Sequence, residues 1–201
     1  MKRTGRSEKM RVIGITGGVG SGKSEVLKFL KERDGAYVCQ MDETAKQLQK
    51  SGTECFLRIV DAFGAEMVGP DGELNRKRLG ECVFSDPEKL ELLNRIVHPA
   101  VFDAVKKEIE EKKAEGVPLY VVEAALLPGA GAALCDELWY IFAREDVRRA
   151  RLKASRHYTD EKITAMIASQ PRAEEFRRAC GAVIDNSGPF DNTMRQIGDR
   201  L

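Results

Sequence analysis

The apolar residues of the chain fall into short unbroken runs separated by stretches with helical spacing. The runs have the length of buried strands and occupy residues 11–16, 36–39, 119–122, 138–142 and 182–184. In the first intervening stretch, 23–33, the apolar residues recur at helical spacing, which predicts a helix packed on a sheet. Strands that alternate with helices predict an α/β fold with a parallel sheet and right-handed crossovers.

Residues 43–115 break this alternation, because they show helical spacing and no strand-like run. Asp86 followed by Pro87 predicts the start of a helix, since aspartate caps a first turn and proline fits its first position. The step His98-Pro99 is expected to end that helix before a charged helix at 100–113. This stretch is therefore interpreted as a helical insertion beside the core.

After the fourth run the chain is predicted to return to helices. An arginine-rich helix is expected at 144–157, a second helix at 159–169 and a last helix from about residue 190. Residues 185–188, Asp-Asn-Ser-Gly, form a predicted turn after the last strand.

The clearest chemical signal follows the first predicted strand directly. Residues 17–24 read Gly-Gly-Val-Gly-Ser-Gly-Lys-Ser and fit the pattern G-x-x-x-x-G-K-[ST] of a phosphate-binding loop. Glycines tolerate positive φ and keep Cβ atoms away from an anion, and the following helix points its positive dipole end at that anion. Lys23 is expected to reach the terminal phosphates, and the Ser24 hydroxyl to face Mg²⁺. The nucleotide-binding candidates are Gly18, Val19, Gly20, Ser21, Gly22, Lys23 and Ser24. The alternative is a glycine-rich turn without a ligand.

Two carboxylates follow predicted strands and are expected at the same edge of the sheet. Asp42 comes after the run 36–39, and Glu123 directly follows the run 119–122. In open parallel sheets the carboxyl ends of the strands are where ligands bind. The alternatives are that Asp42 caps the helix that follows it and that Glu123 is a solvent-facing turn residue.

Composition narrows the class of protein. The chain has 201 residues, 42% of them hydrophobic and 32% charged, with a net charge of +1, which fits one soluble domain and offers no overall attraction for nucleic acid or an anionic membrane. Its five cysteines are scattered and form no C-x-x-C pair, which favours reduced thiols in the cytoplasm. No run reaches membrane-spanning length, and residues 1–9 are expected to form a disordered tail, with Met10 as an alternative start. We expect a cytoplasmic monomer whose partners are small molecules.

Other classes of phosphate-loop proteins fit the sequence less well. A GTPase should carry Asn-Lys-x-Asp to read its base, and this motif is absent. The D-x-x-G match at 61–64 ends a predicted amphipathic helix and does not follow a strand. A motor or AAA-type ATPase would need a much larger chain. A small kinase built from a core, an acceptor-binding lobe and a lid remains.

From Val12 to Gly188 the chain resembles the dephospho-coenzyme A kinases, a branch of the P-loop proteins related to nucleoside-monophosphate kinases. The matching segments are 16–24, Asp42, 63–64, 71–76, 83–84, 96–99, 126–127, Arg151-Leu152 with Arg156, Gln170 and 183–188. The phosphate loop is shared with many families. The His98-Pro99 step and the Ile-Asp-Asn-x-Gly ending are much more specific.

The resemblance implies a three-layer αβα P-loop NTPase fold with a parallel sheet, a helical acceptor-binding insertion and a helical lid. One domain, 1–201, would comprise a core (10–42, 117–143 and 180–201), the insertion (43–116) and the lid (144–179). The implied reaction is phosphorylation of the ribose 3′-hydroxyl of dephospho-coenzyme A by ATP with Mg²⁺, which gives coenzyme A and ADP.

The resemblance also implies roles for the acidic and acceptor-binding residues. Asp42 would orient the acceptor hydroxyl and accept its proton, and Glu123 would hold magnesium together with Ser24. The residues implied for acceptor binding are Asp42, His98, Pro99 and Leu126. The simpler interpretation of His98 is a residue that ends a helix.

Three further residues are implied to contact ATP. Arg151 and Arg156 would close over the phosphates as lid arginines, and Asn186 would lie beside the adenine. Surface salt bridges are the alternative for the two arginines, and a plain turn is the alternative for Asn186.

The chain departs from the family pattern at three places. Gln40 stands where many members have a second aspartate, the segment 123–129 lacks the usual proline and final glutamate, and Glu25 replaces a frequent threonine. Two alternatives therefore stay open. The chain could phosphorylate another small molecule, such as a nucleoside or shikimate, or it could be a nucleotide-binding regulatory module that has lost its chemistry.

Overall fold

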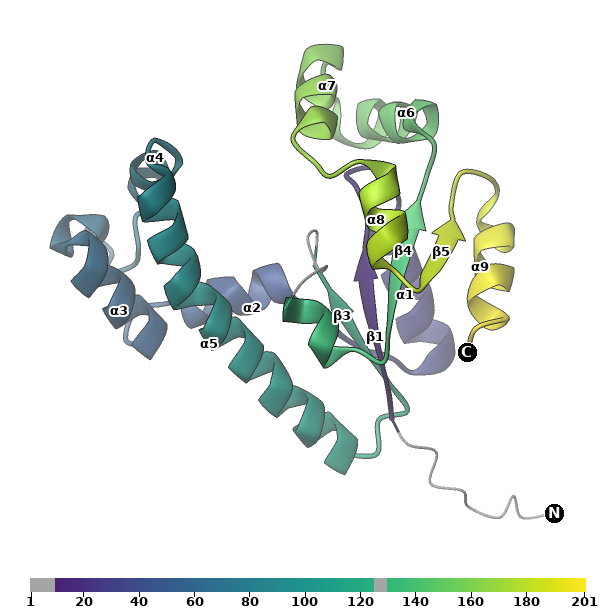
Figure 1. Cartoon of the computed structure of the whole chain (residues 1–201), viewed down its shortest axis with the longest axis horizontal. Helices are drawn as coiled ribbons and strands as arrows, with labels where there is room; N and C mark the ends of the chain where they lie inside the picture. Colours follow the sequence, from purple (N-terminus) through teal and green to yellow (C-terminus); the bar gives the residue numbers. More distant parts are fainter. Residues whose placement is uncertain (1–9, 125–129) are drawn as a thin grey trace. The chain divides into compact units, whose positions relative to one another are not determined.

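A computed structural model describes residues 10–124 and 130–201, so the predicted tail at 1–9 lies outside the described residues. Five strands form one sheet in the order β2-β3-β1-β4-β5 (Figure 1). Their bounds are β1 (Arg11–Thr16), β2 (Tyr37–Gln40), β3 (Leu119–Glu123), β4 (Glu137–Phe142) and β5 (Ala182–Asp185). β1 pairs in parallel with both β3 and β4, and β4 pairs in parallel with β5. The predicted α/β fold is confirmed.

The strand order places a natural binding crevice at the carboxyl end of β1. The chain leaves β1 toward β2 on one side of the sheet, whereas β4 leads to β5 on the other side. Ligands of open α/β sheets bind where neighbouring strands send their connections in opposite directions. The loop that starts at Gly17 lies at this point, because β1 ends at Thr16 and sits between β3 and β4.

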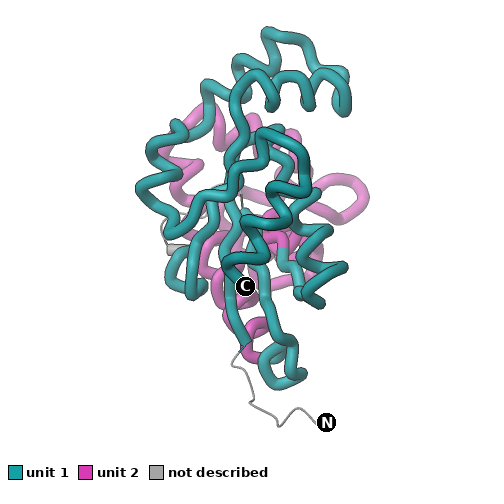
Figure 2. The backbone as a smooth tube through the Cα atoms, turned by 90° about the vertical axis from the view of Figure 1, so that its right-hand side faces the viewer, with its two compact units in different colours: residues 1–39, 111–201 teal, residues 40–110 magenta. Residues whose placement is uncertain are grey.

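The chain divides into two compact units, residues 1–39 with 111–201 and residues 40–110 (Figure 2). The helices of the first unit are α1 (Lys23–Asp34), η2 (Ala130–Leu134), α6 (Glu145–Arg156), α7 (Asp160–Ala168), α8 (Ala173–Ala179) and α9 (Phe190–Gly198). The second unit holds α2 (Met41–Leu48), α3 (Glu54–Phe63), η1 (Ala65–Met67), α4 (Arg76–Phe84) and most of α5 (Pro87–Ala114). The predicted lid, 144–179, falls within the first unit, and its closure stays a prediction.

Alternation along the strands builds a core on each face of the sheet. Trp139 and Ile141 of β4 belong to a buried cluster that includes Leu30 of α1 and Ile197 of α9. Tyr140 lies between them in sequence and points to the other face, where its ring stacks on Phe176 of α8 with 4.8 Å between centroids. α1 with α9 and α8 therefore cover opposite faces, as Figure 1 shows. This alternating burial fixes the strand register, and with it the position of the loop after β1.

Side-chain caps and one arginine organise the second unit. Thr53, Asn75 and Asp86 accept hydrogen bonds from the first turns of α3, α4 and α5. Arg76 joins α4 to α2, because its guanidinium donates to Gln49 Oε1 at 3.2 Å and to the Lys46 carbonyl at 3.4 Å. The Asp-Gly-x-Leu-Asn-Arg segment thus acts as a turn, a cap and a tie between helices.

Three sequence-based expectations need correction. The predicted break at His98-Pro99 is wrong, because α5 runs unbroken through Pro99, with buried residues on both sides of it, Ile96 and Val101 among them. Tertiary burial therefore outweighs the loss of one backbone donor. Asp42 lies in the first turn of α2 and not at the end of β2.

The third correction concerns α8, which the sequence pattern missed. This short helix buries a single apolar side chain, Phe176, so it has no apolar period to detect. Its start is fixed locally, because the Glu175 carboxylate accepts a hydrogen bond from the Arg172 amide at 3.1 Å.

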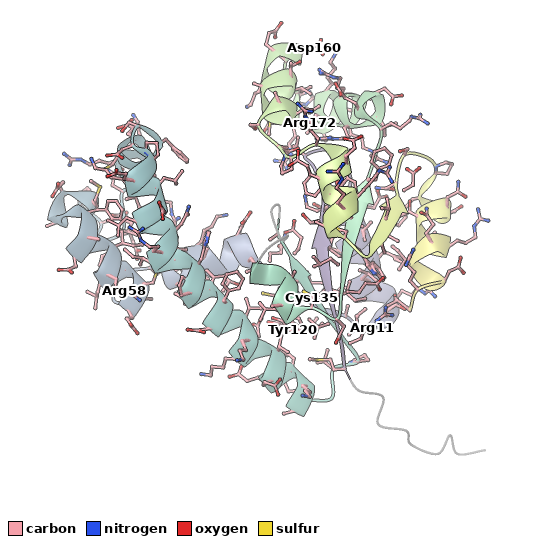
Figure 3. All side chains as sticks on the ribbon, viewed as in Figure 1. Arg11, Arg58, Tyr120, Cys135, Asp160 and Arg172 are labelled. Carbon is pink, nitrogen blue, oxygen red and sulfur yellow. The ribbon has the colours of Figure 1, made fainter. Side chains whose placement is uncertain are left out.

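Within the described residues, no helix has the length and apolar content needed to cross a lipid bilayer. None of the five cysteines, all of which lie in the described part of the chain, forms a disulfide. Burial raises the pKa of the Cys135 thiol, which precedes β4 (Figure 3), to about 12, and that of the Cys180 thiol to about 11. The neutral thiols are thus favoured in the folded chain.

These thiols predict a loss of stability in alkaline solution. The unfolded chain releases thiol protons near the ordinary pKa of 9.0, whereas the folded chain keeps them to higher pH. The free energy of unfolding should therefore be insensitive to these groups below pH 9 and should fall above it. Urea unfolding from pH 7 to 10.5 measures this, and the Cys135→Ala/Cys180→Ala variant should show a shallower decline. An equally steep decline in that variant would contradict the assignment.

Candidate active site

The loop from Gly17 to Gly22 joins the central strand to the first helix. Gly22 occupies the N-cap position of α1 with φ 88°, and no side chain caps this helix. No side chain therefore competes with an anion at the start of α1, and the dipole of the helix favours an anion there. Gly20 has φ 76°, another backbone conformation that favours glycine.

The loop forms one wall of a pocket of about 670 Å³. The lining residues come from the loop, α1, β3, α6, α7 and the connection between α6 and α7: Gly18, Val19, Gly20, Ser21, Gly22, Lys23, Ser24, Glu25, Glu123, Arg151, Leu152, Ala154, Ser155, Arg156, Tyr158 and Met166. The structure thus brings together all the predicted loop residues, Glu123 and both lid arginines. Nothing in the structure explains why Glu25, an exposed carboxylate, stands in this wall.

Lys23 is held in place at the floor of the pocket. Its Nζ donates to the Gly17 carbonyl at 2.7 Å and lies 3.6 Å from Glu123 Oε1. Both side chains are largely buried, with 17% and 11% of their surface exposed. Glu123 reaches this position because it pairs with Ile15 of β1, the residue before the last of that strand. A cation and a carboxylate therefore face one another beside the phosphate loop.

Asn186 binds the loop through its buried side chain. Its side chain is fully buried, its Nδ2 donates to the Ser21 carbonyl at 2.9 Å, and its Oδ1 accepts from the hydroxyl of buried Thr193 at 2.9 Å. The backbone amide of Asn186 also donates to the Phe142 carbonyl. In this structure Asn186 shapes the loop, and the predicted contact with adenine stays a prediction.

The lid arginines occupy different positions. Arg151 donates from Nη1 to the Ser21 carbonyl at 3.2 Å, so that this carbonyl accepts from both Arg151 and Asn186. Arg156, the last residue of α6, is exposed on the pocket wall.

Sequence reasoning missed Arg148, one turn before Arg151 on α6. Its Nε donates to the Val19 carbonyl at 2.8 Å, and its Nη2 donates to Gln170 Oε1 at 2.9 Å. Burial lowers the pKa of this guanidinium, although Tyr140 and Glu145 partly oppose the shift. The spacing of Arg148 and Arg151 on one helix face could have indicated a shared target.

Three of the remaining candidates, Asp42, His98 and Pro99, belong to the second unit. Asp42 is exposed in the first turn of α2, where Gln40 is the N-cap residue, so Asp42 does not cap this helix. His98 and Pro99 are exposed on α5, with the His98 ring edge-on to Phe102 at 6.4 Å. Leu126 lies outside the described residues.

The contact between Gly22 and Asn186 predicts the effect of a methyl group. A Cβ on residue 22 would lie 2.2 Å from Asn186 Nδ2, whereas a Cβ on Gly35, which also has positive φ, would meet nothing within 4 Å. Gly22→Ala should therefore cost about 1–3 kcal/mol more in unfolding free energy than Gly35→Ala and should weaken nucleotide binding. Urea unfolding and calorimetry measure the two effects. Equal losses in the two variants would show that the Asn186 contact is unimportant.

Comparisons with known proteins identify the family of the chain. A family model described as dephospho-CoA kinase matches residues 11–192. The dephospho-CoA kinase of Dehalococcoides mccartyi is 40% identical over 185 residues, which cover 91% of this chain and 92% of the relative. That of Symbiobacterium thermophilum is 39% identical over 189 residues, which cover 94% of this chain and 79% of the relative.

Solved structures share the fold. A crystal structure of a Thermus thermophilus protein matches with a TM-score of 0.78 and 30% identity, covering 96% of both chains. The dephospho-CoA kinase from Campylobacter jejuni matches with a TM-score of 0.69 over 94% of this chain and 96% of its own, and its 18% identity supports the fold alone. By the family match and the identity of its full-length relatives, this chain belongs to the dephospho-CoA kinase family.

Proposed function

We propose that this chain transfers the terminal phosphoryl group of ATP to the ribose 3′-hydroxyl of dephospho-coenzyme A through the residues assigned below. The family supplies the reaction, which is the last step of coenzyme A biosynthesis. One observation supports the residue assignment most directly. The loop, the Lys23–Glu123 pair and the arginines of α6 line one pocket beside the central strand.

The loop would bind the triphosphate of ATP with backbone amides and charge. Phosphoryl transfer depends mainly on positioning and on neutralising charge that spreads over the phosphate oxygens. Lys23 lies ready beside the loop and would exchange its bond to the Gly17 carbonyl for the terminal phosphates. Arg151 and Arg156 would neutralise further charge from the other wall.

Ser24 and Glu123 are the residues that would hold the Mg²⁺ ion that accompanies ATP. Mg²⁺ prefers oxygen ligands and usually takes one or two from protein, with the rest from phosphates and water. A hydroxyl and a carboxylate in the same pocket meet this requirement. The ion would supply charge neutralisation at the transferring group.

The acceptor would be bound by residues of the second unit together with Leu126. Asp42 would orient the 3′-hydroxyl and accept its proton. Gln40, and not Asp42, is the N-cap residue of α2, so Asp42 has no capping role there. His98 and Pro99 would shape the acceptor pocket from α5. We further propose that residues 144–179 close as a lid over the bound substrates, and that the chain acts as a cytoplasmic monomer without nucleic-acid or membrane partners.

The first functional prediction removes the lysine charge. Lys23→Met keeps an unbranched side chain of similar size and should leave the fold intact, but turnover should fall by about two to three orders of magnitude. ADP release is measured with ATP, Mg²⁺ and a panel of acceptors comprising dephospho-coenzyme A, adenosine and shikimate. Lys28→Met, an exposed lysine on the same helix, serves as the control. Full activity of Lys23→Met would contradict the assignment of the loop as the phosphate-binding site. Turnover of another acceptor by the parent protein would contradict the assignment of dephospho-coenzyme A as the substrate.

The second functional prediction concerns Asp42. Asp42→Asn preserves size but cannot accept the hydroxyl proton, so turnover should fall by about two orders of magnitude while ATP binding and melting temperature stay near those of the parent. Glu43→Gln removes the neighbouring carboxylate in the same exposed turn and should remain active. Steady-state kinetics and calorimetry compare the two. Matching activities in both variants would withdraw the catalytic role of Asp42.

A further inference from the structure

Val19 is held by two side chains from outside the phosphate loop. Its amide donates to Gln170 Oε1 at 3.0 Å, and its carbonyl accepts from Arg148 Nε at 2.8 Å. Arg148 Nη2 donates to the same Gln170 oxygen at 2.9 Å, which closes a ring of three hydrogen bonds. Both backbone groups of one loop residue are therefore fixed by side chains of the predicted lid segment.

This ring determines which way the next amide points. In a trans peptide the carbonyl of one residue and the amide of the next point in opposite directions. Because Arg148 draws the Val19 carbonyl outward, the Gly20 amide must face the opposite side. Arg151 and Asn186 do the same at the Ser21 carbonyl, which turns the Gly22 amide. Gly20 and Gly22 both line the pocket.

Gly18 provides independent support, because its neighbours leave no room for a side chain. A Cβ on residue 18 would lie 2.6 Å from Arg148 Nη2 and 2.9 Å from Gln170 Oε1. Both atoms end flexible side chains, so a methyl group there would displace the ring and leave the rest of the loop in place. A glycine at position 18 thus leaves the space that the side chains of Arg148 and Gln170 occupy.

We propose that Arg148 and Gln170 form a loop anchor, a pair of positioning residues that turn the Gly20 amide toward the phosphates of ATP. Neither residue is among the described residues that line the pocket, so the anchor acts through Val19. The inference deepens the proposed function and rests on it only in taking ATP as the ligand.

The test measures binding of Mg²⁺ and the non-hydrolysable analogue AMP-PNP by calorimetry, together with the KM values of both substrates. Arg148→Ala should weaken analogue binding by about tenfold to a hundredfold, the range for a lost charge-assisted hydrogen bond. The KM of ATP should rise while the KM of dephospho-coenzyme A changes less than about twofold. Arg148→Lys, which keeps the charge with a single donor group, should recover only part of the loss.

Arg149→Ala is the matched control, because Arg149 follows on the same helix and bonds to Glu145 and Thr164 without touching the loop. It should bind the analogue as the parent does. Equal losses of analogue binding in Arg148→Ala and Arg149→Ala would show that only the total positive charge of α6 matters. That result would overturn the anchor. Parental binding by Arg148→Ala would overturn it directly.

A double-mutant cycle separates the anchor from general damage to the fold. Gly18→Ala should lose about as much analogue binding as Arg148→Ala, and the double variant should lose little more, because both changes break the same ring. Additive losses would overturn the proposal. If Arg148→Ala fails to fold by circular dichroism, Gln170→Ala carries the test, with weaker ATP binding expected and parental binding contradicting the anchor.

These measurements distinguish the anchor from the proposed function. Analogue binding does not require turnover, so a parent protein that binds AMP-PNP but fails to phosphorylate dephospho-coenzyme A would reject the proposed function alone. Loss of the acceptor reaction with unchanged analogue binding in Arg148→Ala would reject the anchor alone.

Discussion

A backbone loop can hold an anion only if its carbonyl dipoles point away from that anion. In this protein the requirement is met by side-chain donors: Lys23 for the Gly17 carbonyl, Arg148 for Val19, and Arg151 with Asn186 for Ser21. Three of these four side chains are cationic, so they also add to the field that attracts phosphate. The shape of the loop thus depends on groups from α1, from α6 and from the turn after β5.

The sheet makes these distant groups meet. Burial of alternate residues on both faces sets the register of β1, β4 and β5, and the segments that follow their carboxyl ends carry the loop, α6 and Asn186. Burying the Asn186 amide would be costly without partners, but Ser21 and Thr193 satisfy it. The site therefore depends on the core, because apolar packing fixes the positions at which the polar groups of the site meet.

Much of this could be predicted from the sequence, because the decisive signals were local. The strands, the glycine loop and the carboxylate at the end of β3 follow from runs and spacing over a few residues. The spacing of Arg148 and Arg151 on α6 could indicate a shared target but could not identify it, because the partners of Arg148, Val19 and Gln170, are remote in sequence. From the resemblance, Asn186 was predicted to contact the ligand. Its burial and its hydrogen bond show that its side-chain amide binds the Ser21 carbonyl of the loop. The predicted helix break at Pro99 was wrong, because the burial of apolar side chains along the whole of α5 outweighs the local tendency of proline to end a helix.

The unbroken course of α5 has a consequence for engineering chimeric kinases. The boundary between the two compact units falls between residues 110 and 111, inside this helix, which continues to Ala114. Backbone bonds from each residue to the fourth before it span that boundary. A graft of the second unit cut at 110 would sever them and leave a helix end without caps. An exchange with a related enzyme should instead place its second junction beyond Gly116, where φ 78° already marks a turn after the helix.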